Sequence, residues 1–107
     1  MSLLEIEKLA VVSTAHVSED TANKLPATAL DLAGRPDLPA LPWWPAFVRD
    51  EGWLFYLYGY QDEFEYKYEL APKDLKDVLQ YVRNSGCMWC LFDCDGTKVD
   101  GLFTYEW

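Results

Sequence analysis

A lone histidine and several aspartates near the end of the chain are the residue types best suited to acid–base or metal chemistry. His16 is the only histidine and directly follows an apolar run, while Asp93, Asp95 and Asp100 lie around Gly96. If the last strand pairs beside the first, His16 would lie near Asp93 or Asp95, and such a pair could act as a general base or hold a metal. A hydrogen-bonded histidine at a helix start and solvated acids at an Asp-Gly turn explain the same residues without a reaction. We favour this second interpretation.

The three cysteines, Cys87, Cys90 and Cys94, have a spacing that resembles part of a zinc cluster. Sulfur ligands of one zinc ion lie within about 4 Å of each other, because each zinc–sulfur bond is about 2.3 Å long. Cys90 and Cys94 fall on a predicted strand, where four residues span about 13 Å. We therefore expect reduced, mostly buried cysteines and no zinc site. We expect no other metal and no cofactor.

Two surface features favour binding over catalysis. The first is a run of acidic residues that could form one face and imitate a row of phosphates: Asp62, Glu63, Glu65, Glu69, Asp74 and Asp77. Lysines interrupt this run, so an ordinary solvated face is the alternative. The second feature is Trp43 and Trp44 in a proline-rich loop at 35–45, which would serve either as interface anchors or as a lid over the core.

The apolar pattern predicts a sheet of several strands. Residues 9–14 form a short β-branched run that predicts a central strand buried on both faces. Residues 46–59 predict a hairpin, and residues 64–70 alternate apolar and charged side chains as a half-exposed strand does. Residues 88–94 predict a further strand, and residues 101–107 a short strand or extended arm.

Two helices are expected to cover the sheet. Ser18 is placed as the N-cap of a helix over 19–33, which Pro26 must break or kink. Residues 72–85 predict the clearest helix, with Pro72 at its start, Gly86 after its end and one apolar stripe. We predict one α+β domain over residues 1–107, a mostly antiparallel sheet with two helices on one face, related to the split βαβ (ferredoxin-like) plan.

Charge and hydropathy exclude several classes of function. The chain has 18 acidic against 9 basic residues and a formal net charge of −9. This balance argues against direct binding of nucleic acid, which requires clustered Lys and Arg, and against anionic membrane surfaces. No stretch approaches the length of an apolar membrane span, and the first residues lack the features of a secretory signal. We expect a cytoplasmic protein.

Several stretches carry a resemblance to a family. Residues 12–21, Gly52-Trp53, Gly86-Cys87 and the ending over 92–107 resemble a family of short bacterial proteins of unknown function, found largely on plasmids and other mobile elements. The resemblance implies a bacterial or phage origin, a cytoplasmic setting and a role in mobile-element biology. It implies no activity.

The expected function is protein–protein interaction by a small acidic binding protein, which would inhibit a host defence or nucleic-acid-handling factor. The expected binding residues are Trp43, Trp44, Asp62, Glu63, Glu65 and Glu69. The alternative is a small metal-dependent enzyme that uses His16 with Asp93, Asp95 or Asp100. The oligomeric state stays open, and a homodimer that pairs through residues 64–70 is a further alternative.

Overall fold

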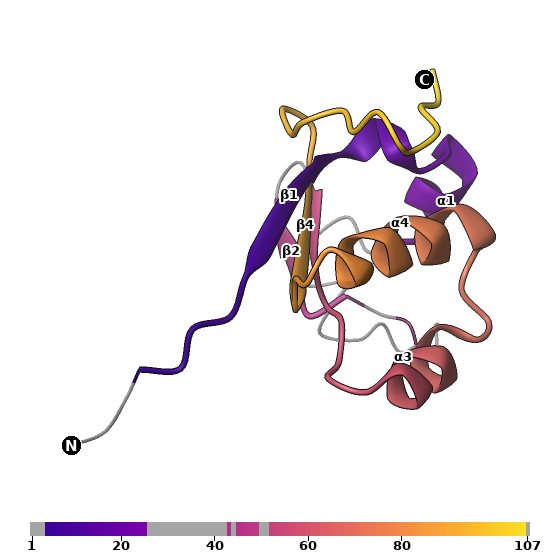
Figure 1. Ribbon diagram of the computed structural model, residues 1–107. Helices are drawn as coiled ribbons and strands as arrows, with labels where there is room; N and C mark the ends of the chain where they lie inside the picture. The colour runs from indigo at the N-terminus through magenta and orange to yellow at the C-terminus, as the bar shows by residue number, and fades with distance from the viewer. Residues whose placement is uncertain (1–3, 26–42, 44, 50–51, 107) are drawn as a thin grey trace.

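The computed structural model describes residues 4–25, 43, 45–49 and 52–106. Four strands form one sheet in the order β1-β4-β3-β2 (Figure 1). They are β1 (Leu9–Ser13), β2 (Phe47–Arg49), β3 (Gly52–Tyr56) and β4 (Trp89–Asp93). β1 pairs with β4 in parallel, whereas the β2–β3 and β3–β4 pairs are antiparallel. The sheet is therefore mostly antiparallel, as predicted.

β1 corrects one expectation, because it is an edge strand and not a central one. Its neighbour on one side is β4, and on the other side the described residues add a single bridge between Val12 and Thr97. Leu9 and Val11 are 47% and 45% exposed, so the strand is not buried on both faces. The interior positions belong to β4 and β3, and β4 is the other strand with a nearly continuous apolar sequence.

The helices lie on one side of the sheet (Figure 1). The described ones are α1 (Glu19–Lys24), α3 (Gln61–Tyr68) and α4 (Lys73–Asn84), and a 3-10 turn η1 (Thr14–His16) follows β1. The α+β class and the one-sided helices agree with the sequence. The split βαβ relation is not confirmed, and the parallel strands β1 and β4 are direct neighbours.

α4 forms as its sequence predicts. Its stripe of Leu75, Val78, Leu79 and Val82 is buried against the sheet. Gly86 follows the helix with φ at +92°, a backbone conformation that glycine adopts without the steric cost of a side chain. The hairpin of β2 and β3 is also confirmed.

α1 begins where predicted, with Ser18 as its N-cap accepting a hydrogen bond from the Thr21 N–H. Asp74 of α4 accepts hydrogen bonds from the Ser18 N–H and the Thr21 hydroxyl, which ties α1 to α4. Residues 26–33 of the predicted helix and most of the proline-rich loop lie outside the described residues.

Residues 64–70 are not the predicted strand, since most of them belong to helix α3. The strand prediction is wrong because the alternating pattern also fits a helix: Phe64 and Tyr68 are four residues apart and lie on one helical face. These two side chains are fully buried with ring centroids 4.9 Å apart. Tyr66 and Leu70, which a strand would bury with them, are 81% and 77% exposed. This removes the basis for a homodimer paired through that strand.

After β4, residues 95–106 form an extended segment that crosses the ends of β1 and η1 (Figure 1). Thr97 and Tyr105 bond to the backbone of Ser13 and Ala15. The described part of this segment contains no strand longer than the single bridge at Thr97, so the extended-arm alternative is the one observed.

Candidate functional site

An open hollow of about 500 Å³ lies beside the first turns of α3, and aromatic and charged side chains line it. Its lining residues are Tyr58, Asp62, Glu63, Tyr66 and Lys67. The hollow thus combines two of the acids predicted for binding with two tyrosines and a lysine that the sequence did not single out.

The backbone at Tyr58 is unusual. Tyr58 has φ at +59°, and it is the non-glycine residue with a positive φ among the described residues. A bulky side chain in this region costs about 1–3 kcal/mol, so the surrounding structure must hold it there. The restraints lie on both sides of Tyr58: the Leu57 N–H donates to the Met88 carbonyl, and the Arg83 guanidinium donates to the Gly59 carbonyl.

The strained turn brings the Tyr58 ring to a defined place. The ring lies 5.1 Å from the Tyr56 ring, and the Lys67 ammonium lies 5.3 Å from its centroid. This is a cation–π contact, in which the negative face of the ring attracts the cation. The turn therefore presents an aromatic face at which a positive charge is stabilised.

Asp62 and Glu63 supply the negative charge of the hollow. Both are exposed in the first turn of α3, where acidic side chains also favour the helix dipole. Their position is therefore partly explained by helix stability. Their charge toward solvent, next to two aromatic rings, makes the hollow suited to a cationic group.

Glu65 and Glu69 do not join this hollow. Glu65 pairs with Lys76 at 2.7 Å and accepts a hydrogen bond from Gln61 at 2.9 Å. The hydrogen bonds from Lys76 and Gln61 hold the pKa of the Glu65 carboxyl below its usual value. Glu69 is exposed at the C-terminal end of α3. The predicted acidic run is thus divided by the fold. Asp62 and Glu63 line the hollow, whereas Glu65, Asp74 and Asp77 are bound to Lys76, to Ser18 and Thr21, and to Lys73.

Trp43 is not the exposed anchor that was one of its two predicted roles. Its side chain is only 4% exposed and belongs to the hydrophobic core, which agrees with the alternative of a lid over the core. It is therefore not accessible to a partner in this structure. Trp44 lies outside the described residues.

His16 is buried at 1% exposure, and both ring nitrogens are engaged by the segment after β4. The Val99 N–H donates to Nε2 at 2.8 Å, so the proton sits on Nδ1, which donates to the Phe103 carbonyl at 2.8 Å. This arrangement fixes the tautomer and leaves neither nitrogen open to a substrate. His16 clamps the extended segment onto η1.

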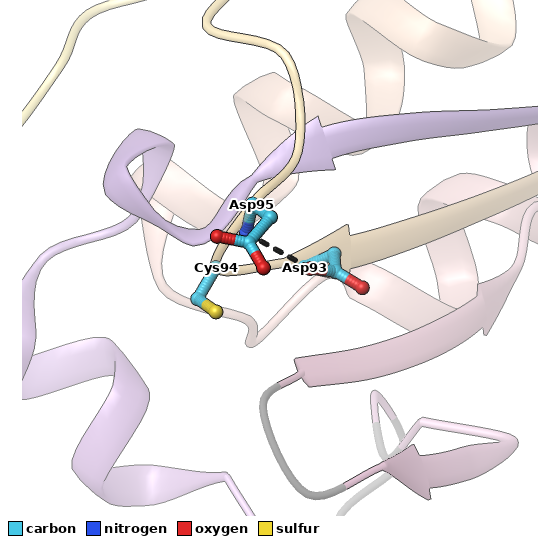
Figure 2. A group of neighbouring side chains, drawn as sticks. All are labelled: Asp93, Cys94 and Asp95. Carbon is cyan, nitrogen blue, oxygen red and sulfur yellow. Dashed lines mark hydrogen bonds between the residues drawn. The ribbon is translucent and has the colours of Figure 1, made fainter.

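Asp93, Cys94 and Asp95 gather at the end of β4 and on the turn that follows it (Figure 2). One ligand atom from each lies within 4.8 Å of the others, and the Asp95 N–H donates to the Asp93 carboxylate at 2.9 Å. His16 is not part of this group, nor are Cys87 and Cys90, among the residues that the structure describes. Burial raises the pKa of the Cys90 thiol, which favours the uncharged form and disfavours metal binding there.

A second hollow, of about 370 Å³, lies where the parallel strands β1 and β4 end. Its lining residues are Ser13, Thr14, Ala15, Cys94, Lys98 and Tyr105. The Ser13 hydroxyl caps η1 by accepting from the Ala15 N–H, so it already has a structural role. This hollow has less aromatic surface and lacks the acidic pair of the hollow at α3.

None of the helices in the described parts of the chain is both long and apolar enough to cross a lipid bilayer. No curated protein and no solved structure shows significant similarity to the chain. Residues 9–107 match the family described as "Family of unknown function (DUF5983) C-terminal domain". The match begins at the first residue of β1 and includes every strand and helix described above. The chain belongs to this family of unknown function, DUF5983.

Proposed function

We propose that this protein is a small acidic binding protein that acts by contact with a basic segment of a protein partner. The observation that supports this is the hollow at α3, where Tyr58 and Tyr66 stand beside Asp62 and Glu63. Aromatic faces and carboxylates are the groups that recognise Lys and Arg side chains. The Lys67 ammonium over the Tyr58 ring is an internal example of the same contact.

The charge of the whole chain supports the same type of partner. A net charge of −9 attracts basic proteins over a Debye length and raises their association rate. The same charge repels nucleic acid and anionic membranes, so the proposed ligand is the basic protein itself.

A bacterial, cytoplasmic, mobile-element setting would make a defence or nucleic-acid-handling factor a suitable partner. Such a factor carries Lys and Arg on the surface that contacts phosphates. Carboxylates that bind these side chains would compete with nucleic acid and inhibit the factor.

A titration with a short peptide of glycine and arginine tests the proposed site. The hollow variant Asp62→Asn with Glu63→Gln removes two negative charges from the first turn of α3. The control variant Glu19→Gln with Asp20→Asn removes the same two charges from the first turn of α1. We expect the hollow variant to bind the peptide about tenfold more weakly, as two charge-assisted contacts are lost, and the control to bind nearly as the unmodified protein does.

An equal loss of affinity in both variants would mean that net charge alone attracts the peptide, and the hollow would not be the site. Capture from a bacterial lysate with the same pair of variants extends the test to natural partners. A partner lost only with the hollow variant is expected to be basic.

A further inference from the structure

No described helix covers the face of the sheet opposite α1, α3 and α4 (Figure 1). The pairing register places two rows of apolar side chains across this open face. One row is Leu9, Trp89 and Tyr56, and the other is Val11, Leu91, Leu54 and Phe47. Leu9, Val11 and Phe47, on the two edge strands, are 47%, 45% and 60% exposed, whereas Leu91 between them is 8% exposed.

A sheet that meets water on one face normally alternates apolar and polar side chains along each strand. Here β1 and β4 carry apolar residues on both faces, which is the pattern of strands buried on both sides. The helices account for only one of these faces. Exposed apolar side chains gathered on one face in this way favour an interaction site.

The open face continues into the hollow at α3 through a chain of aromatic rings. The Trp89 ring lies 4.8 Å from the Tyr56 ring, which lies 5.1 Å from the Tyr58 ring of the hollow. An apolar surface therefore leads directly to the position where Lys67, Asp62 and Glu63 surround Tyr58. One elongated ligand could contact both.

Size and charge indicate what covers the face. Four strands are about 19 Å wide, the length of a helix of three to four turns. Acidic groups flank the rows: Glu7 accepts a hydrogen bond from the Trp89 indole, and Asp93 ends β4. A second copy would bring another net charge of −9, and a face of about 19 by 17 Å is well below the ~800 Å² per partner of a stable dimer.

We infer that the open face binds the apolar side of an amphipathic, basic helix of the partner, whose Lys or Arg side chain enters the hollow at α3. This inference rests on the proposed function and adds the larger part of the contact surface. Trp89 lies in the covered area and would report the binding by its fluorescence.

The test uses synthetic helical peptides of about 14 residues. One peptide places leucine on one side of the helix and lysine on the other, and a second has the same residues in scrambled order. The face variant is Val11→Thr with Phe47→Thr, because threonine suits strands but removes apolar surface. The control is Leu70→Thr with Phe103→Thr, two apolar residues that are 77% and 72% exposed elsewhere.

We expect the amphipathic peptide to change the tryptophan fluorescence of the protein and to bind the face variant at least tenfold more weakly, with the control unaffected. Equal binding of the scrambled peptide, or equal binding to face variant and control, would overturn the inference. Circular dichroism and melting temperatures confirm that each variant is folded.

Other occupants of the face would also overturn it. A dimeric mass that the face variant converts to a monomer would show a second copy there. NMR contacts between Leu54 or Trp89 and residues 26–42 in the free protein would show that the chain covers the face itself.

The two variants separate this inference from the proposed function. If the Asp62→Asn, Glu63→Gln variant binds the amphipathic peptide normally while the face variant does not, the open face is the binding site and the hollow is not. If the face variant binds normally while the Asp62→Asn, Glu63→Gln variant does not, the hollow is the binding site and the inference about the open face is wrong.

Discussion

Replacing His16 by alanine is expected to destabilise the fold, since the histidine connects η1 to the segment after β4. The substitution removes two hydrogen bonds of 2.8 Å, to Val99 and Phe103, and a side chain that is only 1% exposed. A partly buried N–H left without an acceptor costs about 1–3 kcal/mol, and loss of a buried side chain of this size adds about 1.5 kcal/mol or more. We expect the free energy of unfolding to fall by about 3 kcal/mol.

Urea unfolding measures this loss, and hydrogen exchange locates it. The Val99 amide should exchange faster in the variant, because its acceptor is gone. His16→Gln should lose less stability, since its amide oxygen is able to accept the Val99 hydrogen bond. Phe103→Ala is the control: it keeps the acceptor carbonyl, and its side chain is 72% exposed. We expect it to change stability by no more than about 0.5 kcal/mol.

A His16→Ala protein with unchanged stability and unchanged exchange at Val99 would refute the clamp. It would also revive the alternative in which His16 is a catalytic group, for which the fold should survive its removal. The experiment therefore separates a structural histidine from a reactive one.

Two further predictions concern Asp74 and Tyr58. Partial burial alone would raise the pKa of Asp74, but the hydrogen bonds from Ser18 and Thr21 outweigh it and hold the pKa below the ordinary value of 3.8. The stabilisation is therefore complete above that ordinary value and is lost as the pH falls through the lowered folded-state pKa. Unfolding of the unmodified protein and of Asp74→Asn, followed from pH 6 to pH 2, should show a smaller acid-dependent loss in the variant; parallel curves would contradict the assignment. At Tyr58, glycine should give a protein about 1 kcal/mol more stable than alanine does, because both remove the ring contacts and only glycine relieves the positive φ. Thermal unfolding compares the two, and equal stabilities would mean that the backbone there is not strained.

The sequence predicts α4 and the β2–β3 hairpin well because each has local signals that agree. The α4 stripe has the helical period, and Pro72 and Gly86 mark its two ends. In the hairpin, two apolar runs flank a glycine, and chain connectivity alone makes the strands neighbours. No distant contact is needed to decide either element.

The strand prediction over residues 64–70 is wrong because the sequence of α3 fits both the strand period of two and the helical period of about 3.6. A strand would bury Phe64, Tyr66, Tyr68 and Leu70 together, whereas a helix buries only Phe64 and Tyr68. The choice depends on whether Tyr66 and Leu70 find partners in the packed domain, and this is a tertiary property. The position of β1 at the sheet edge is also tertiary, since strand order is set by pairings between distant segments.

The candidate site was predicted only in part. Asp62 and Glu63 belong to the acidic run that the sequence shows, but the sequence does not tell them apart from Glu65. Lys76, eleven residues away, makes that distinction by pairing with Glu65. Tyr58 enters the hollow through a positive φ, for which the following Gly59 is the only local hint. Trp43, which the sequence allows as either an interface anchor or a lid, is in the core.

The residues that first suggest chemistry and the residues that form the binding surface differ in what the fold requires of them. His16 is fully engaged by Val99 and Phe103, and the Asp93 carboxylate accepts from Asp95 in the turn that starts the crossing segment. Gly96 lies on the same turn, where an added Cβ would lie 2.4 Å from the Val12 carbonyl oxygen, so the turn is built for close backbone contact. These polar groups are thus explained by the path of the backbone.

The hollow and the open face have no such explanation. Tyr58 has a strained backbone, and the Tyr66 side chain is 81% exposed. On the edge strands β1 and β2, the apolar side chains of Leu9, Val11 and Phe47 are also exposed. The strained backbone at Tyr58 has a free-energy cost, and the exposed side chains contribute little to the core of the described chain. A bound partner would recover that cost by burying the rings and the apolar rows. For this reason, the search for function should begin at the hollow and the open face and not at the histidine.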